Sequence, residues 1–182
     1  SNRANNMGEG LEKYIKDIFA NTIYSSSNDR KTIQHQTFSY LGSKNYSPDA
    51  MLRGGDAIEI KKIENRSSDI ALNSSHPKQK LSKQDNRVAT ACKTARDDSD
   101  WEERDIIYVV GYVPKGTDTL KMLGMVYGTE YCASHASSSP ISSFQRINPI
   151  HMRQFICLGK FKVRNFCDLV LYRMKYTLIH IL

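Results

Sequence analysis

The chain has 182 residues, of which 40% are hydrophobic and 25% are charged. This length fits one compact domain with its own core and is short for two, and the composition excludes a collagenous or broadly disordered chain. The formal net charge of +7 favours a polyanionic partner over an acidic one, although charge alone does not establish nucleic-acid binding.

The cysteines and the apolar C-terminal segment narrow the class of protein further. Four cysteines, at positions 92, 132, 157 and 167, form no CxxC pair, so we expect reduced thiols and neither a zinc site nor a disulfide framework. Charged side chains interrupt the apolar stretch at 166–182, which argues against a membrane span. The five histidines show no metal-ligand spacing. We therefore expect a cytoplasmic protein that is not bound to a membrane.

Hydrophobic periodicity and turn residues predict a mixed β-sheet flanked by helices, which is an α/β fold. The expected elements, in chain order, are a helix over 8–20, strand-like content over 32–42, a β-hairpin over 48–63, a helix over 82–96, a buried strand over 105–113 and an antiparallel neighbour over 121–131. A serine-rich loop is expected over 134–143, and the element types beyond 147 stay open.

The predicted hairpin contains the residues that indicate a chemical function. Its strands are 49–52 and 56–62, and Arg53-Gly54-Gly55 forms the turn, since Gly-Gly supplies the positive backbone angles that a tight turn needs. Side chains alternate faces along a strand, so Glu59 and Lys61 share one face, while the isoleucines at 58 and 60 point into a core.

Folding the hairpin at its glycines brings Asp49 opposite either Glu59 or Ile60, depending on the length of the loop. Two carboxylates and a lysine then meet on adjacent strands, with the Ile60 carbonyl as a further hard oxygen ligand. Such a set suits Mg²⁺, which binds one or two carboxylates and keeps several waters. Lys61 could hold or help deprotonate the attacking water and offset charge in the transition state. Asp56 is a competing carboxylate, for which we expect a minor role at most.

A glutamate and a lysine two residues apart are common on solvent-facing strands, so that pair alone indicates little. The preceding Pro48-Asp49, the Gly-Gly turn and the basic net charge together favour a metal-dependent nuclease over an ordinary sheet surface.

Three segments in order resemble the NgoPII-type type II restriction endonucleases of the PD-(D/E)XK nuclease superfamily. They are NRANNMGEGLEKYIKDIFA, SPDAMLRGGDAIEIKKIE and ALNSSHPKQKL, and the resemblance covers residues 2–101, more weakly to 132. It implies a restriction-endonuclease-like fold, and a homodimer that cleaves double-stranded DNA with Mg²⁺, typically at the palindrome GGCC.

Residue by residue, the resemblance places the metal-binding carboxylates at Asp49 and Glu59 and the catalytic lysine at Lys61. An acidic residue on the first helix often faces the metal site in this fold, and Glu12 fits that place, with Glu9 as the alternative. An ordinary exposed carboxylate on a helix is the other interpretation of Glu12. Members of the family are longer than 182 residues. We therefore expect residues 1–182 to form a single endonuclease domain that is incomplete at one or both ends.

Polar and basic side chains after the hairpin are candidates for contact with DNA. Asn and Ser can bond to base edges, whereas lysines more often hold phosphates, and an ordinary capped loop before a solvated helix is the alternative interpretation. The candidates are Asn73, Ser74, Ser75, Lys78, Lys80, Lys83 and Arg87.

The sequence therefore predicts a type II restriction endonuclease, which would work beside a cognate DNA methyltransferase in a bacterial or archaeal cytoplasm without touching it. Two alternatives stay open: a repair or recombination nuclease of the same fold, and a DNA-binding remnant that no longer cleaves.

Overall fold

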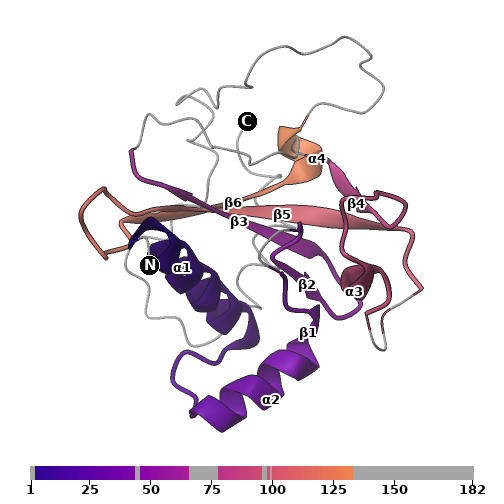
Figure 1. Cartoon of the computed structure of the whole chain (residues 1–182), viewed down its shortest axis with the longest axis horizontal. Coiled ribbons are helices and arrows are strands. Elements are labelled where there is room, and N and C mark those ends of the chain that lie inside the picture. The colour runs from indigo at the N-terminus through magenta and orange to yellow at the C-terminus, as the bar shows by residue number, and fades with distance from the viewer. Residues whose placement is uncertain (1–2, 44–45, 66–77, 96–97, 99, 133–182) are drawn as a thin grey trace, which may run out of the picture.

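A computed structural model describes residues 3–43, 46–65, 78–95, 98 and 100–132 (Figure 1). The elements, in chain order, are α1 (Arg3–Ala20), α2 (Ser27–Thr37), β1 (Phe38–Tyr40), β2 (Ala50–Leu52), β3 (Ala57–Ile63), β4 (Lys80–Ser82), α3 (Thr90–Lys93), β5 (Glu103–Tyr112), β6 (Met122–Tyr127) and α4 (Gly128–Tyr131).

The strands form one mixed sheet in the order β1-β2-β3-β5-β4, with β6 also paired to β5. β3 and β5 run parallel, and the other pairs are antiparallel. One edge of β5 pairs with β3, while the other edge pairs with β4 over 103–105 and with β6 over 107–112. The long apolar run predicted as a buried strand is thus the centre of the sheet.

Each face of the sheet carries its own hydrophobic cluster, because successive strand residues point to opposite faces. α1 covers one face, where its apolar stripe packs against β3, β5 and β6. This cluster includes Leu11, Ile15, Ile18, Phe19, Ile58, Ile60, Ile107, Val109, Leu123 and Met125. The second cluster includes Met51, Ala57, Leu81, Val88, Cys92, Ala95, Trp101, Ile106 and Tyr108.

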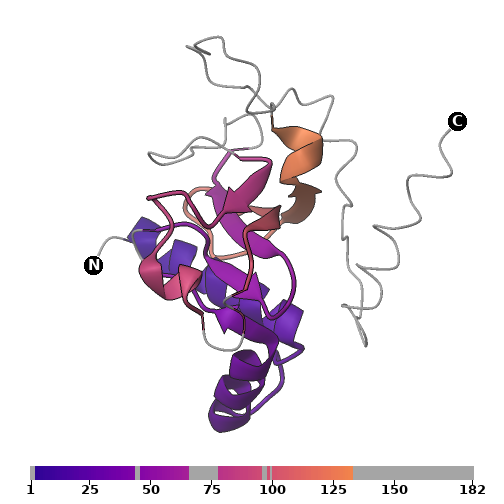
Figure 2. The same ribbon diagram turned by 90° about the vertical axis from the view of Figure 1, so that its right-hand side faces the viewer.

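The segment 32–42 differs from its predicted strand character. Helix α2 occupies 27–37, and only the short β1 follows it. α2 buries none of its residues and lies at the far end of the body from α4 in both views (Figure 1, Figure 2). Its first turn is capped by Ser26, whose side chain accepts from the N–H of Asp29. At its last turn, the Arg53 guanidinium donates to the carbonyl of His35 (2.8 Å).

The helix predicted over 82–96 is also wrong. The strand β4 ends at Ser82, turns follow, and only the four residues of α3 are helical. Val88, Cys92 and Ala95 are buried as predicted, in the cluster that includes Trp101, but Ala91 is exposed. By contrast, the first helix, the hairpin, the central strand and its antiparallel neighbour are confirmed, and the last of these turns into α4 after residue 127.

Cys92 and Cys132 are free and buried, as expected, whereas positions 157 and 167 lie outside the described residues. The expected serine-rich loop and the segments beyond 147 also lie outside them. Among the helices that the model describes, none is long and apolar enough to cross a membrane.

Candidate active site

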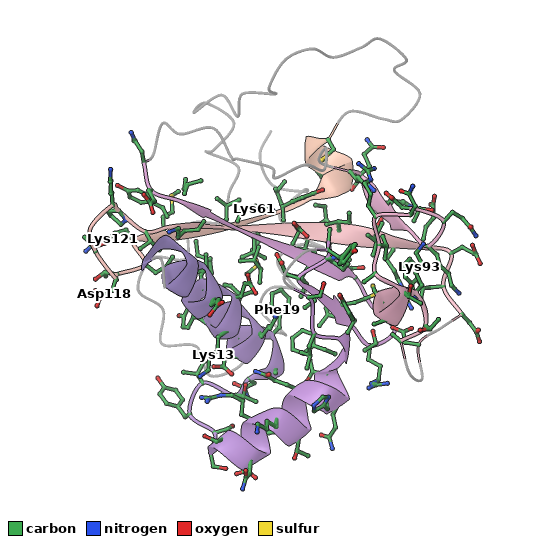
Figure 3. All side chains as sticks on the ribbon, in the orientation of Figure 1. Lys13, Phe19, Lys61, Lys93, Asp118 and Lys121 are labelled. Atoms are coloured by element: carbon green, nitrogen blue, oxygen red, sulfur yellow. The ribbon has the colours of Figure 1, made fainter. Side chains whose placement is uncertain are left out.

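The hairpin brings the predicted site residues together on one face of the sheet. Ala50 pairs with Ile58 and Met51 with Ala57, and the backbone N–H of Asp49 donates to the Ile58 carbonyl (3.0 Å). This register sets Asp49 opposite Glu59, which is the first of the two arrangements left open by the sequence. Directly opposed side chains of an antiparallel pair lie on the same face. Lys61, two residues further along β3, shares that face and lies near the middle of the sheet (Figure 3).

Glu59 is a buried carboxylate with a partner on each oxygen. The residue is only 7% exposed. Its Oε1 lies 2.7 Å from the Lys61 ammonium, and its Oε2 accepts from the Ser47 hydroxyl (2.8 Å). The two contacts fix the direction of the carboxylate and hold the ammonium beside it. The sequence reasoning missed Ser47, although its place two residues before Asp49 was visible.

Asp49 is the most strongly perturbed acid near the hairpin. Burial, and then repulsion from Glu59, raise the pKa of its carboxyl from 3.8 to about 7. The Ile60 N–H, which donates to Asp49 Oδ2 (2.6 Å), acts in the opposite direction, as does Lys61. At neutral pH this pair of carboxylates is thus poorly compensated by the protein's own charges.

Glu12 acts on the pair from a distance. It lies on α1, where its carboxylate is 3.7 Å from the Lys16 ammonium. Repulsion from Glu12 contributes to the raised pKa of Asp49, as a smaller cause than burial and Glu59. Lys16 also donates to the Leu41 carbonyl (3.0 Å) and so ties the helix to the chain that leads into the hairpin.

Gly42 positions the same part of the hairpin. It has a φ of +84°, and a Cβ built on it would lie 2.3 Å from the Asp49 carbonyl oxygen. Only a glycine permits this close approach and this backbone angle. The sequence reasoning did not single out Gly42, because the contact is with a residue seven positions away.

Asp56, the competing carboxylate, is engaged elsewhere. Its Oδ2 accepts from the Tyr127 hydroxyl on β6 (3.0 Å). Burial raises its pKa, and the bond from Tyr127 opposes that rise. The predicted minor role is consistent with this separate partner.

Four of the candidates for DNA contact lie in the described part of the chain: Lys78, Lys80, Lys83 and Arg87. The other three, Asn73, Ser74 and Ser75, lie outside the described residues. Lys78 and Arg87 both contact Asp85, with the Arg87 Nε 3.1 Å from its Oδ1. Lys80, on β4, lies 3.8 Å from Asp105 and 3.9 Å from Glu103 at the exposed end of β5. Lys83 follows β4, and its backbone N–H donates to the Glu102 carbonyl (2.9 Å).

The arrangement has the donors that a hard divalent cation requires. Asp49, just before β2, and Glu59, on β3, supply carboxylate oxygens, and their mutual repulsion is of the kind that such a cation relieves. No group of three or more His, Cys, Asp and Glu side chains is placed to hold a metal within the part of the chain that the structure describes. The two carboxylates together with carbonyl oxygen or water would fit the preferences of a small hard ion.

The mixed sheet flanked by helices, with this acidic pair at the start of β2 and on β3, defines an α/β protein with a restriction-endonuclease-like fold. The chain belongs to the NgoPII restriction endonuclease family, whose model matches residues 1–153. It is similar to the type II restriction enzyme NgoPII of Neisseria gonorrhoeae, with 53% identity over 133 residues. The match covers 73% of this chain and 46% of that relative, so the chain spans about half of the relative's length. No solved structure matches the chain.

Proposed function

We propose that this chain acts as a type II restriction endonuclease, which hydrolyses phosphodiester bonds at a short palindrome in double-stranded DNA with Mg²⁺. The observation that carries the proposal is the register of the hairpin. It opposes Asp49 to Glu59 and keeps Lys61 on the same face, in a chain that is 53% identical over 133 residues to a type II restriction enzyme. The proposed target is GGCC, the palindrome that the family resemblance implies.

In this proposal Asp49, Glu59 and the Ile60 carbonyl hold the ion. Bound Mg²⁺ supplies Lewis-acid polarisation of the scissile phosphate and a lower pKa for a coordinated water. Ser47 and Lys61 keep the Glu59 carboxylate oriented, through contacts of 2.8 and 2.7 Å. Because Lys61 is held beside the acidic pair, its ammonium is placed to hold the attacking water and to offset the charge that develops on the phosphate oxygens.

Glu12 has a supporting part in the proposal. Its carboxylate adds negative charge near Asp49, which strengthens the attraction of the site for a divalent cation. A palindromic target implies two-fold symmetry, so the proposed active form is a homodimer. A cognate methyltransferase in the same bacterial or archaeal cytoplasm would protect the host's DNA.

The test is digestion of a sequenced plasmid with the 182-residue chain in Mg²⁺, followed by mapping of the fragment ends. Ends at one short palindrome support the proposal. Cleavage confined to junctions, flaps or free ends would replace it with a repair or recombination nuclease. Salt-sensitive binding with no cleavage in Mg²⁺ or Mn²⁺ would replace it with a DNA-binding remnant.

A matched pair of lysine variants tests the role of Lys61. We expect Lys61→Ala to lower the cleavage rate by about 10²–10³-fold, a typical loss when one charge-stabilising donor is removed. Lys62→Ala is the control, because Lys62 is the next residue of β3 and pairs with Glu64 (2.8 Å) away from the acidic pair. Equal rates for the two variants would remove the role assigned to Lys61.

A further inference from the structure

Asp85 brings two cationic side chains together beside β4. The Arg87 guanidinium contacts both of its oxygens, with Nε 3.1 Å from Oδ1 and Nη2 3.2 Å from Oδ2. The backbone N–H of Arg87 also donates to Oδ1 (2.9 Å), and the Lys78 ammonium contacts Oδ2. One carboxylate with an exposed fraction of 12% thus holds two cations, which leaves the group with a net charge of +1.

The cations of this group keep donors for a further acceptor. An ammonium has three N–H groups and a guanidinium has five, more than one carboxylate can accept. The Arg87 side chain is 48% exposed, so it can reach a ligand from solvent. Burial and the nearby guanidinium lower the pKa of Lys78 to about 8. Additional negative charge would therefore stabilise the two cations together.

The backbone of Lys78 is fixed to the strand that lies beside Glu59. Tyr108 is opposite Glu59 in the parallel register of β3 and β5. Its hydroxyl donates to the Lys78 carbonyl (3.0 Å) and accepts from the Lys78 N–H (2.7 Å). Gly128, at the start of α4, packs so closely that a Cβ there would lie 2.4 Å from the same carbonyl oxygen. The segment is thus held on two sides, on the sheet that carries the acidic pair.

We propose that Lys78 and Arg87 together bind one backbone phosphate of the DNA, with Asp85 as the residue that positions both cations and Tyr108 as the residue that fixes the site relative to Glu59. The proposal rests on the proposed function, since it names part of the surface on which that substrate would lie. A phosphate is the fitting ligand because Arg and Lys recognise it through charge-assisted hydrogen bonds. Lys80 is not part of this site, because its acidic neighbours are Glu103 and Asp105.

The number of phosphates bound can be measured by the salt dependence of binding. Affinity for a duplex containing GGCC is measured without divalent metal over a salt series, for the wild type, Lys78→Gln, Arg87→Gln and the double variant. Each phosphate contact contributes about 0.9 to the slope of log K against log salt. If both cations hold one phosphate, the double variant loses about 0.9, as each single variant does. A loss of about 1.8 in the double variant, or no loss in any variant, would overturn the proposal.

Asp85→Asn distinguishes a positioning carboxylate from one that only cancels charge. The variant gains one unit of net positive charge, so without a positioning role it would bind DNA more tightly. We expect it instead to bind severalfold more weakly than the wild type, and tighter binding would contradict the role of Asp85. Lys121→Gln is the control for the loss of one positive charge in Lys78→Gln and Arg87→Gln. Lys121 is exposed and lies at the opposite end of the sheet from β4 (Figure 1, Figure 3). Should Asp85→Asn not fold, the salt slope of the Lys78→Gln/Arg87→Gln double variant, compared with those of the two single variants, decides the proposal.

The outcomes for this site and for the proposed function remain separable, because binding is measured without the ion that cleavage needs. A wild type that binds with the expected slopes but does not cut would refute the endonuclease and leave the phosphate site. A wild type that cuts at a palindrome, with unchanged salt slopes in the variants, would support the endonuclease and refute the phosphate site.

Discussion

The replacement of Asp49 by asparagine is expected to stabilise the metal-free protein. Burial and Glu59 raise the pKa of this carboxyl from 3.8 to about 7, so the folded state holds the proton more tightly than the unfolded state. Stability therefore falls as the pH rises from about 4 to about 7 and is level above that. Since one pKa unit corresponds to about 1.4 kcal/mol, the ionised group costs at most about 4 kcal/mol at pH 8.

Asparagine removes this cost while its amide oxygen can still accept from the Ile60 N–H. We expect a gain nearer to about 2 kcal/mol, because the Ile60 N–H bonds more weakly to an amide oxygen than to a carboxylate. This gain corresponds to a rise in Tm of roughly 4–8 °C. Below about pH 5 the gain should shrink to less than half, since the wild-type carboxyl is then protonated in the folded state.

The assay is thermal unfolding of both proteins with EDTA at about pH 5 and about pH 8, and then with Mg²⁺ at the higher pH. A ligand that binds only the folded state raises Tm, so Mg²⁺ should stabilise the wild type more than Asp49→Asn. Asp118→Asn serves as the control, because that carboxylate is exposed in the turn before β6 (Figure 3). An Asp49→Asn protein no more stable than the wild type at pH 8, or a gain independent of pH, would refute the reasoning.

Two further substitutions test how the site is held. Gly42→Ala should lower the free energy of unfolding by at least about 3 kcal/mol and abolish cleavage, since its Cβ would lie 2.3 Å from the Asp49 carbonyl oxygen; Gly54→Ala, at a φ of +63° with open space around it, should cost only about 1 kcal/mol in the same denaturant titration. Tyr108→Phe should cost about 1–3 kcal/mol, because it leaves the half-buried backbone groups of Lys78 without their hydroxyl partner. A loss below 0.5 kcal/mol, on the order of a neutral surface change, would contradict that role.

Local patterns predicted those parts of the fold in which sequence neighbours determine the structure. The hairpin follows from a Gly-Gly turn between two short strands, and alternation along β3 correctly placed Glu59 and Lys61 on one face and Ile58 and Ile60 in the core. The register could not be decided between two arrangements, because the turn length was not evident from the residues. The structure resolves it through the pairing of Ala50 with Ile58.

The wrong elements are those in which tertiary contacts override local preference. α2 buries no residue, so it has no apolar stripe to reveal it, and Arg53 stabilises its last turn from the hairpin. Conversely, Val88, Cys92 and Ala95 recur at helical spacing, yet only Thr90–Lys93 of that segment is helical, and the three are buried in the cluster that includes Trp101. Gly42 packs against the Asp49 carbonyl, and Tyr108 bonds to the backbone of Lys78, thirty positions away. Local sequence patterns do not reveal such contacts.

One edge of β5 is divided between β4 and β6, and this division separates the proposed phosphate site beside β4 from the proposed catalytic site within a single sheet. The acidic pair lies at the start of β2 and on β3, on the opposite edge of β5, and the pairing of these strands does not involve β4. The chain around β4 could therefore be exchanged or lengthened, and the hold on the DNA backbone changed, without rebuilding the strands that would hydrolyse it. Such changes would have to keep Tyr108, because its hydroxyl bonds the backbone of Lys78 to the strand beside Glu59.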